Sequence, residues 1–390
     1  MICGITKFHL DIFRKPEYFY SGFFIIKDCI SFKKSNCVAL KTKNIAMKNI
    51  DYIIVGDGYA ALFFAHQLTK NNKSFVIFSE GSKSASQVSA GIINPVVLKK
   101  FTTFWLAQQQ LDFLKITLDE IGQYTGKNYL VNAPIHRIFH DENEQKLWIK
   151  KSKTEELSGF LNREFKQIKG VHNRFDTGKV NQSARLDVNG FFNNMLQYYE
   201  AHSQLIKEKF DYEKVNISDS AYKNYTFKNI VFCEGMGVKK NPYFSDIPVI
   251  PNKGHHIKVK LSNEISDDIT IKKKHFLFLL QDRLYFYGGT YHRHQTDQNI
   301  DDSAIEQLKN GLKEICPENF TVNEINFGFR PTVKDRRPII GRHPEHHNLY
   351  VFNGLGARGI LNGCYFSKSL FDYIDKGIPL PEEVNLNRFK

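Results

Sequence analysis

Short apolar runs that end in glycine turns alternate along this chain with longer segments whose apolar residues recur every three to four positions. The first run, residues 52–55, reads Tyr-Ile-Ile-Val and passes through a glycine turn into residues 62–68, Leu-Phe-Phe-Ala-His-Gln-Leu. A second apolar run follows at residues 74–78. Strand, tight turn, helix and strand in this order are typical of a βαβ unit, so the pattern predicts a parallel sheet that starts near residue 52.

The same two periods predict the elements that follow. Helical periodicity extends over residues 104–122, 186–206, 303–315 and 360–374. Strand-like runs occupy residues 230–233, 256–261, 276–280, 284–288 and 350–352. Residues 128–168 alternate short aromatic runs with charges, which predicts strands and a surface helix. Strands that end in glycine turns therefore lie at both ends and in the middle of the chain, and this order predicts a mixed α/β fold of two discontinuous domains.

The turn after the first strand reads Gly56-x-Gly58-x-x-Ala61. The first glycine can adopt the backbone conformation of a tight turn, the second lets the main chain approach a pyrophosphate, and the small alanine permits close packing of helix on strand. The helix N-terminus adds unpaired N–H groups and the positive end of the helix dipole. The alternative is a glycine-rich turn without a ligand. We expect a dinucleotide to contact Gly56, Gly58, Tyr59, Ala60 and Ala61.

An acidic residue is expected at the end of the second strand, where it would bind the adenosine ribose. Counted from Gly56, Ser79 occupies this position and Glu80 follows one residue later. Either Glu80 reaches back to the ribose, or Ser79 makes a weaker hydroxyl contact. Because no arginine stands here to bind a 2′-phosphate, the sequence disfavours NADP.

The composition limits the class of protein. The chain has 390 residues, 42% of them hydrophobic, and a formal net charge of +13. Such a charge is typical of nucleic-acid-binding proteins, but the lysines are scattered, which favours a general compositional bias. Six cysteines without a CxxC pair indicate reduced thiols and a cytoplasmic protein, no apolar run is long enough to span a membrane, and no metal site is predicted. Residues 1–46 sustain neither period, and we expect them to form a poorly ordered extension before a fold that begins at Met47.

Two further segments offer backbone groups to a ligand. Residues 84–95 are dense in small and hydroxyl-bearing side chains, which predicts a loop that lies against a cofactor through Ala90, Gly91, Ile92 and Asn94. Residues 354–359 read Gly-Leu-Gly-Ala-Arg-Gly between a strand and a helix. In a flavoenzyme, such a helix N-terminus would stabilise the negative charge that develops on the reduced flavin. By itself, the segment favours a glycine turn at the start of a helix that binds no ligand. Together with the first glycine site, it favours a flavin contact.

One arginine is a candidate for substrate binding. Arg330 leaves a predicted strand immediately before Pro331, so its guanidinium is held at a defined edge. A guanidinium matches a carboxylate through two parallel hydrogen bonds. The alternative for any one arginine is a surface ion pair, and for Arg336 and Arg337 we prefer this alternative.

Together, these segments resemble the D-amino-acid oxidase superfamily of FAD-dependent oxidoreductases, which includes glycine and sarcosine oxidases. The resemblance covers residues 50–388 and rests on the order and spacing of seven motifs. They are Gly56-x-Gly58-x-x-Ala61, Ser89-Ala90-Gly91-x-x-Asn94-Pro95, Phe232-Cys233-Glu234-Gly235, Pro251-x-x-Gly254, Gly288-Gly289-Thr290-Tyr291, Gly328-x-Arg330-Pro331 and Gly354-x-Gly356-x-x-Gly359.

The resemblance implies that FAD is the cofactor and that an antiparallel sheet covers the flavin bound to a Rossmann-like domain. It assigns residues 47–130, 176–248 and 328–390 to the FAD-binding domain, and residues 131–175 and 249–327 to an inserted substrate domain. The residues that it places against the flavin are Gly235, Gly356, Ala357, Arg358, Gly359 and Ile360. It places the substrate carboxylate on Arg330, with Tyr291 as a hydroxyl donor and Arg358 as a further candidate catalytic residue.

The activity that the resemblance implies is oxidation of the C–N bond of a small amine or amino acid. Hydride would pass to flavin N5 and the imine would hydrolyse in water, so no catalytic His or Cys constellation is required.

Two alternatives stay open. The C-terminal motifs are similar to the oxidoreductase domain of tRNA wobble-uridine modification enzymes, which removes a carboxymethyl group from a secondary amine. Against a tRNA substrate stand the scattered lysines, the absence of a recognisable RNA-binding module, and the fact that no methyltransferase segment of the kind these enzymes carry is recognised in the 390 residues. We therefore favour a small metabolite. The second alternative is a non-catalytic flavoprotein.

Overall fold

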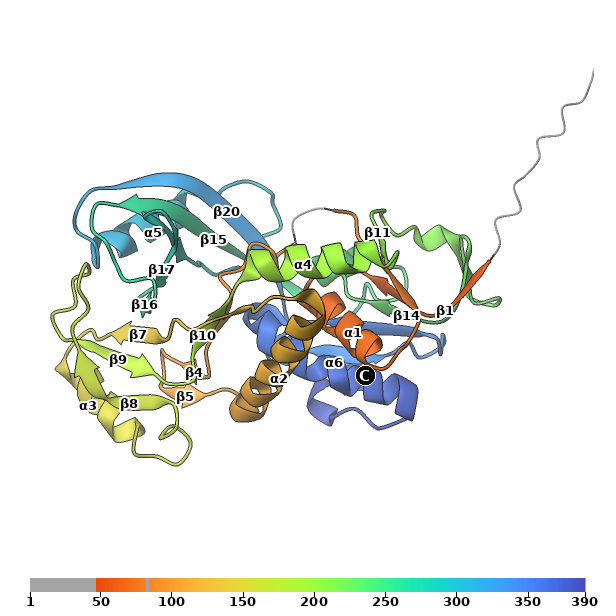
Figure 1. Cartoon of the computed structure of the whole chain (residues 1–390), viewed down its shortest axis with the longest axis horizontal. Helices are drawn as coiled ribbons and strands as arrows, with labels where there is room; N and C mark the ends of the chain where they lie inside the picture. Colours follow the sequence, from red (N-terminus) through yellow and green to blue (C-terminus); the bar gives the residue numbers. More distant parts are fainter. Residues whose placement is uncertain (1–46, 82–83, 390) are drawn as a thin grey trace, which may run out of the picture. The chain divides into compact units, whose positions relative to one another are not determined.

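The computed structural model describes residues 47–81 and 84–389, which belong to one compact unit. The extension expected at residues 1–46 lies outside the described residues. Two large sheets dominate the described part of the chain: β1, β14 and β11 belong to one, and β15, β17 and β20 to the other (Figure 1). The predicted mixed α/β fold is confirmed.

The first sheet has a parallel centre. β2, β1, β14 and β22 pair side by side in parallel, and β11 extends the sheet beyond β2. Its strands are β1 (Lys48–Val55), β2 (Phe75–Phe78), β11 (Leu205–Ile206), β12 (Val215–Asn216), β13 (Ala221–Tyr222), β14 (Tyr225–Phe232), β21 (Ile339–Arg342) and β22 (Leu349–Asn353). All of β2 and β22 is buried, as expected for strands covered on both faces. The neighbouring strands come from the beginning, the middle and the end of the chain.

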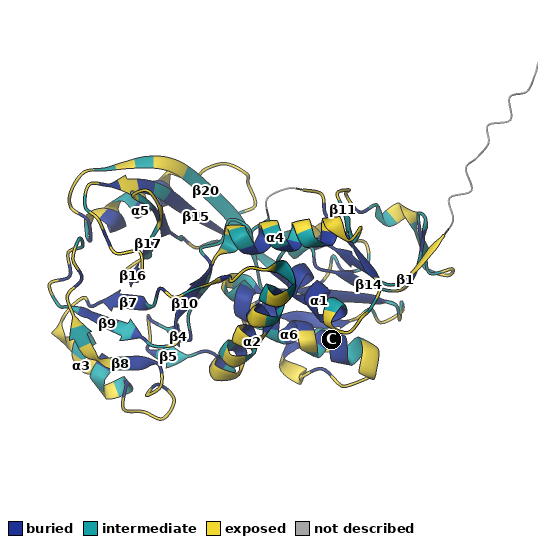
Figure 2. Ribbon diagram, in the orientation of Figure 1, coloured by how far each residue is buried: buried dark blue, intermediate teal, exposed yellow. Residues whose placement is uncertain are grey.

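Helices cover this parallel centre. α1 and α6 pack against each other, α2 packs on α6, and the outward faces of α2 and α4 are exposed (Figure 2). The helices of the described residues are α1 (Tyr59–Lys70), α2 (Ala107–Thr125), α3 (Glu142–Lys151), α4 (Val188–Ala201), α5 (Asp302–Lys313) and α6 (Gly359–Lys376). Ten of the twelve residues of α1 are buried, because the helix is enclosed by the sheet and by its neighbours.

The second sheet is largely antiparallel. Its strands are β7 (Ile135–Ile138), β8 (Leu161–Lys166), β9 (Thr177–Val180), β15 (Ile250–Leu261), β16 (Thr270–Lys272), β17 (Phe276–Gln281), β18 (Leu284–Gly288), β19 (His292–Arg293) and β20 (Phe320–Thr332). Ile257 and Val259 of β15 pack with Leu308 and Leu312 of α5 in one core cluster. Since side chains alternate along a strand, the other face of β15 carries Asn252, Gly254 and His256.

Two small sheets connect the large ones. β10 (Ala184–Leu186) pairs with both β3 (Ile92–Ile93) and β6 (Leu130–Val131), and β4 (Val96–Val97) pairs with β5 (Thr102–Thr103). The helix predicted over residues 186–206 is shorter than expected. α4 ends at Ala201, and the chain then enters β11. The division into an FAD-binding and a substrate domain stays a prediction.

Candidate functional site

The first glycine turn has the geometry that its sequence predicts. Gly56 has φ = +111°, and a Cβ atom at this position would lie 2.6 Å from the carbonyl oxygen of Cys233. The Gly56 N–H donates to the carbonyl of Phe78 at 2.9 Å, which fixes the turn between β2 and β14. At Gly58 an added Cβ would lie 3.0 Å from Ser86 Oγ. Only glycine satisfies both the backbone angle and the space at position 56.

Two helices begin at such turns without a carboxylate cap. α3, α4 and α5 are capped by the side chains of Asp141, Asp187 and Asp301, which accept from backbone N–H groups of the first turn. The N-cap of α1 is Gly58, which has no side chain, and Arg358 at the N-cap of α6 makes no side-chain cap hydrogen bond within the described residues. No N-cap side chain therefore occupies the N-terminus of α1 or α6. At α1 the Tyr59 N–H is bonded to Ser86 Oγ, and the next N–H groups can face an anionic or electron-rich ligand.

The two turns lie against each other. Gly359, the first residue of α6, is so close to Tyr59, the first residue of α1, that an added Cβ would lie 2.9 Å from the tyrosine Cδ2. Gly354 and Gly356 both have positive φ, +72° and +58°, and Gly354 packs on Val333. Ala357 is exposed and Ile360 is buried. The structure thus brings the first and the C-terminal glycine sites together, as the resemblance implies.

A third glycine turn, at the end of β14, lies beside the first and the C-terminal glycine turns. Gly235 has φ = +55°, and its carbonyl accepts from Asn353 Nδ2 at 2.9 Å. An added Cβ at Gly235 would lie 4.0 Å from Pro331 Cγ, so this turn also adjoins the strand that carries Arg330. Ala60 and Ala61 are buried in α1, beneath the first turn. The three turns therefore share one edge of the parallel sheet.

The loop from residue 84 links this edge to the second sheet. Ser86 Oγ accepts from the Tyr59 N–H at 3.2 Å, and the Tyr59 hydroxyl lies 2.8 Å from Ser89 Oγ. On the other side of the loop, an added Cβ at Gly328 of β20 would lie 2.9 Å from Val88 Cγ2. The loop is thus held between the first turn and the sheet of Arg330.

The end of this loop is anchored by backbone contacts. Gly91 has φ = +68°, and an added Cβ would lie 2.4 Å from the Leu186 carbonyl oxygen. Ile92 pairs with β10, and Asn94 Oδ1 accepts from the Val96 N–H at 3.0 Å. Ala90, one residue before the glycine, is half-buried. The loop therefore has a defined path, and its contact with a cofactor stays a prediction.

Arg330 is held by backbone and an aromatic ring. An added Cβ at Gly254 would lie 2.2 Å from the guanidinium Nη1, and one at Gly289 would lie 2.9 Å from Nη2. Nη1 donates to the Thr290 carbonyl at 3.0 Å, and Cζ lies 4.4 Å from the ring centre of Tyr291. Within the described residues Arg330 forms no ion pair. The surface ion pair considered as an alternative is therefore absent there, and the charge is available to a ligand.

One detail of the prediction was wrong. Arg330 does not leave its strand, because β20 continues to Thr332. The proline after it does not end the strand, since β20 pairs only with β15 among the described residues and Pro331 faces Pro251 across this pair. Proline is tolerated in an edge strand, where its missing N–H costs no hydrogen bond.

Arg358 is a further guanidinium that interacts with Tyr291. Its Cζ lies 4.4 Å from the ring centre of Phe104. Burial, together with repulsion from Arg336 and Arg337, lowers the pKa of Arg358 to about 10, and only Tyr291 opposes this. No ion pair of Arg358 occurs within the described residues. A carboxylate bound here would relieve this repulsion.

An aromatic row on the same face of the second sheet was missed in the sequence. The ring of His256 stacks on Phe286 at 4.5 Å, Phe286 stacks on Phe278 at 4.8 Å, and Arg185 Cζ lies 4.1 Å from the Phe278 ring centre. Burial lowers the pKa of His256 to about 4, so the imidazole is neutral near pH 7. The only feature of the sequence that could have indicated this row is the position of His256. It stands two residues after Gly254 in a strand and therefore on the same face of the sheet.

At the end of β2, the structure pairs Ser79 with an acidic residue of the first glycine turn. Ser79 is buried, and its hydroxyl donates to Asp57 Oδ2 at 2.7 Å. Glu80 is an exposed residue. Asp57, which stands between the two glycines of the first turn, was not selected from the sequence.

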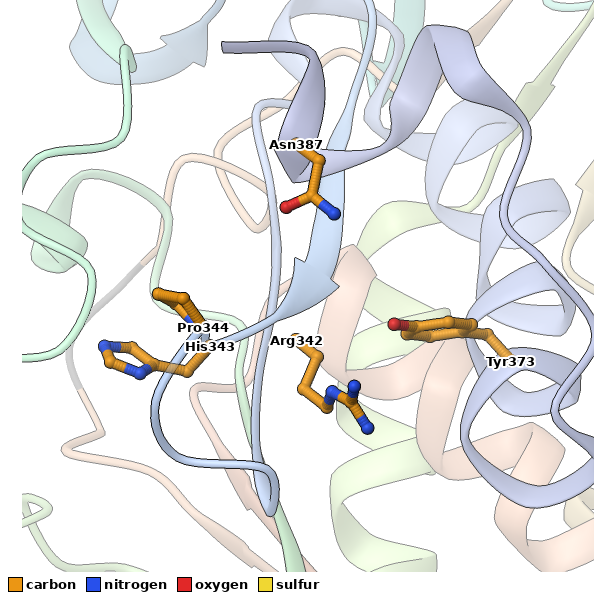
Figure 3. A pocket seen from close by; sticks show the side chains of 5 residues that line it. All are labelled: Arg342, His343, Pro344, Tyr373 and Asn387. Atoms are coloured by element: carbon orange, nitrogen blue, oxygen red, sulfur yellow. The ribbon is translucent and has the colours of Figure 1, made fainter. Parts of the chain in front are cut away.

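A polar hollow elsewhere on the surface is separate from these residues. It is lined by Arg342, His343, Pro344, Tyr373 and Asn387, and the side chains of Arg342 and Tyr373 point toward the same opening (Figure 3). None of the predicted site residues lines it. The hollow therefore does not belong to the candidate site.

Other classes of site are not found in the part of the chain that the structure describes. Residues 47–81 and 84–389 contain no group of three His, Cys, Asp or Glu side chains placed to hold a metal ion. None of their helices combines the length and the apolar character needed to cross a bilayer. Cys233, Cys316 and Cys364 are buried free thiols, and burial raises the pKa of each.

Comparison with known proteins agrees with this geometry. Residues 51–372 match the family model of FAD dependent oxidoreductases, DAO. The chain is 22% identical to the bifunctional protein of tRNA 5-methylaminomethyl-2-thiouridine biosynthesis from Shewanella sediminis, over 86% of this chain and 58% of that protein. It therefore spans less than two thirds of that relative.

Solved structures share the fold. Glycine oxidase from Geobacillus kaustophilus superposes with a TM-score of 0.72 at 17% identity, over 88% of this chain and 98% of the oxidase. Iminodiacetate oxidase from Chelativorans sp. BNC1 superposes with a TM-score of 0.70 at 18% identity, over 85% and 97% of the two chains. With its family model matched over residues 51–372 and its glycine turns gathered at one sheet edge, the chain belongs to the DAO family of FAD-dependent oxidoreductases.

Proposed function

We propose that this enzyme oxidises the C–N bond of a small amine or amino acid that carries a carboxylate. The observation that supports this most is the Arg330 guanidinium, which packs on two glycines and on Tyr291 and has no ion pair within the described residues. A guanidinium that has no counterion in the protein favours an anionic ligand. Glycine oxidase and iminodiacetate oxidase, which share the fold, are named for amines that bear carboxylates.

The proposal gives each of the three predicted catalytic residues a role. Arg330 binds the substrate carboxylate, Tyr291 donates a hydroxyl hydrogen bond from a side chain that is 61% exposed, and Arg358 adds a second positive charge. The neutral ring of His256 and its aromatic neighbours form an apolar wall that excludes water from the reacting carbon. No side chain has to act as a strong base, since the amine reacts in its neutral form.

The cofactor residues follow the glycine turns. The first turn and the N-terminus of α1 would hold the pyrophosphate of FAD, because the turn admits close backbone approach and the N-cap residue leaves the N–H groups after Tyr59 in the first helical turn uncapped. The N-terminus of α6 would face the flavin ring, with Gly235 and the loop around Gly91 beside it. The chemistry that FAD supplies when bound is acceptance of a hydride from the carbon next to the amine. The buried free thiols fit a reducing cytoplasm, which is the location that we propose.

An anaerobic spectroscopic screen tests this proposal. We expect the full-length protein to purify with flavin, and its absorbance to bleach when an amino acid or N-alkyl glycine is added without oxygen. Matched pairs isolate the carboxylate: glycine against methylamine, and sarcosine against dimethylamine. Because Arg330 binds the carboxylate, the member without it should bleach the flavin about 10- to 100-fold less efficiently. Equal bleaching by both members, or none with any amine, would contradict the proposal.

One observation favours a second candidate, a tRNA carrying a carboxymethylaminomethyl group. The relative from Shewanella sediminis is named for tRNA modification, and the similarity extends over 86% of this chain. The carboxymethyl group on an amine presents the same carboxylate to Arg330 as glycine does. A formal charge of +13 suits a polyanionic partner.

Salt dependence separates the two candidates. An enzyme that contacts several tRNA phosphates loses roughly 10³-fold or more in affinity between 50 and 200 mM salt, because bound counterions are released. We expect the enzyme to turn over a free amine. We also expect its affinity for tRNA to be neither specific nor steeply dependent on salt. Tight, steeply salt-dependent binding of tRNA and bleaching only by the modified tRNA would establish the second candidate instead.

A further inference from the structure

The adenosine end of the predicted FAD site lacks the expected acidic residue but contains a different one. In dinucleotide-binding folds the carboxylate that binds the ribose stands at the end of the second strand of the βαβ unit. Here Ser79 stands there, directly after β2, and its buried hydroxyl donates to the carboxylate of Asp57 at 2.7 Å. The carboxylate of Asp57 therefore reaches the end of β2 from the turn that follows the neighbouring strand, β1.

The sheet register explains how this is possible. β1 and β2 are adjacent and parallel, with Val55 opposite Phe78. Asp57 follows Val55 by two residues and Ser79 follows Phe78 by one, so both emerge at the same edge of the sheet. Asp57 also lies between the two glycines whose backbone is predicted to contact the pyrophosphate. Its carboxylate thus occupies the space between the pyrophosphate turn and the end of β2.

The environment of Asp57 suits a ligand with hydroxyl donors. The residue is 9% exposed, and burial raises the pKa of its carboxyl group. Within residues 47–81 and 84–389, its carboxylate accepts hydrogen bonds from Ser79 and from its own backbone N–H. A carboxylate has about four acceptor positions, so it can accept two more hydrogen bonds. The 2′- and 3′-hydroxyls of a ribose would provide them and would stabilise the ionised form.

Glu80 is a weaker candidate for this contact. It is an exposed residue one position beyond the end of the strand pair, whereas the buried side chain at that edge is Ser79, which is bonded to Asp57. Asp57 is therefore a third candidate beside the two that the sequence left open, Ser79 and Glu80.

We propose that Asp57 binds the adenosine ribose hydroxyls of FAD, and that Ser79 positions its carboxylate through the hydroxyl hydrogen bond. The acidic group of this site has moved from the end of the second strand into the glycine turn. The inference rests on FAD as the cofactor of the family, but not on the identity of the substrate.

Flavin affinity of two variants tests this. Asp57→Ala in the full-length chain keeps the glycine turn and removes the carboxylate. We expect the Kd for FAD, measured by fluorescence titration of the flavin-depleted protein, to rise about 10- to 100-fold, the loss typical of a charge-assisted hydrogen bond. Adding Ser79→Glu to Asp57→Ala returns a carboxylate to the end of β2, and we expect most of the affinity to return. Asp119→Ala, an exposed aspartate on α2, is the matched control.

Stability distinguishes binding from a structural role. Burial already disfavours the ionised form of Asp57, so the Tm of flavin-depleted Asp57→Ala should fall no further than that of Asp119→Ala. If Asp57→Ala does not fold, the isosteric Asp57→Asn replaces it, with the same expected loss of affinity. Unchanged FAD affinity in the folded variant, or no rescue by Ser79→Glu, overturns the inference and leaves the proposed function intact. A wild-type protein that binds no FAD overturns both.

Discussion

Replacing Arg330 by alanine is expected to raise the KM for a carboxylate-bearing amine about 10- to 100-fold while the flavin stays bound. The guanidinium is the charged group that packs between two glycines and the Tyr291 ring, and it has no ion pair within the described residues. Removing it takes away the charge that would bind the substrate, but none of the glycine turns that would hold the cofactor. Steady-state kinetics and the flavin spectrum of the purified variant measure both effects.

Two further variants make this result specific. Arg330→Lys keeps the charge but not the two parallel hydrogen bonds, so its KM should lie between those of the wild type and of Arg330→Ala. Arg174→Ala removes an exposed arginine far from these glycines in the sequence and should leave KM unchanged. A lower Tm with an unchanged KM in Arg330→Ala would show that the residue is structural, and would move the carboxylate to another group such as Arg358.

The second large effect is expected at Gly56. Gly56→Ala places a Cβ atom 2.6 Å from the Cys233 carbonyl oxygen at a residue with φ = +111°, so strain and steric overlap add together. Gly56 and Cys233 directly follow β1 and β14, and their backbones are held by hydrogen bonds to Phe78 and Val55, so they cannot move aside like a flexible side chain. We expect a loss of roughly 2–5 kcal/mol in the free energy of unfolding and a protein that purifies without flavin.

A matched glycine separates the two causes. Gly126 has a positive φ of +70°, but an added Cβ would meet nothing within 4 Å. Gly126→Ala should therefore cost only the backbone strain, about 1–2 kcal/mol, and should retain flavin. Chemical denaturation and the ratio of flavin to protein absorbance measure the two variants side by side. Equal losses in both would mean that the close approach to Cys233 has no role.

Local pattern was enough to predict the first turn and its surroundings. The apolar run of β1, the glycines after it and the periodicity of α1 are adjacent in the sequence, and each specifies its own conformation through side-chain period or backbone freedom. The strands at residues 230–233 and 350–352 were recognised in the same way. Their assembly into one parallel sheet followed from the resemblance to a known family, because single-strand patterns do not specify their partners.

Contacts between distant segments could not be predicted in this way. The pair of Asp57 and Ser79 depends on the register of β1 against β2, and a shift of one residue would have separated them. The row from His256 to Arg185 joins side chains of four strands, and these side chains are spread from residue 185 to residue 286. Arg330 stays inside its strand because β20 lies at a sheet edge, where the missing N–H of Pro331 costs no hydrogen bond. The roles of these residues in binding stay predictions.

The order of strands in the first sheet has a consequence for biosynthesis. β1 pairs with β14, and β14 pairs with β22, so the edge that carries the glycine turns is built from segments about 300 residues apart. A nascent chain that has exposed only its first two hundred residues contains the turn of Gly56 but not β14 beside it, nor the helix α6 that packs on α1. The exposed edge of β1 in such a chain is a site for mispairing and aggregation until synthesis reaches the C-terminal helix. We therefore expect flavin capture to follow the translation of α6.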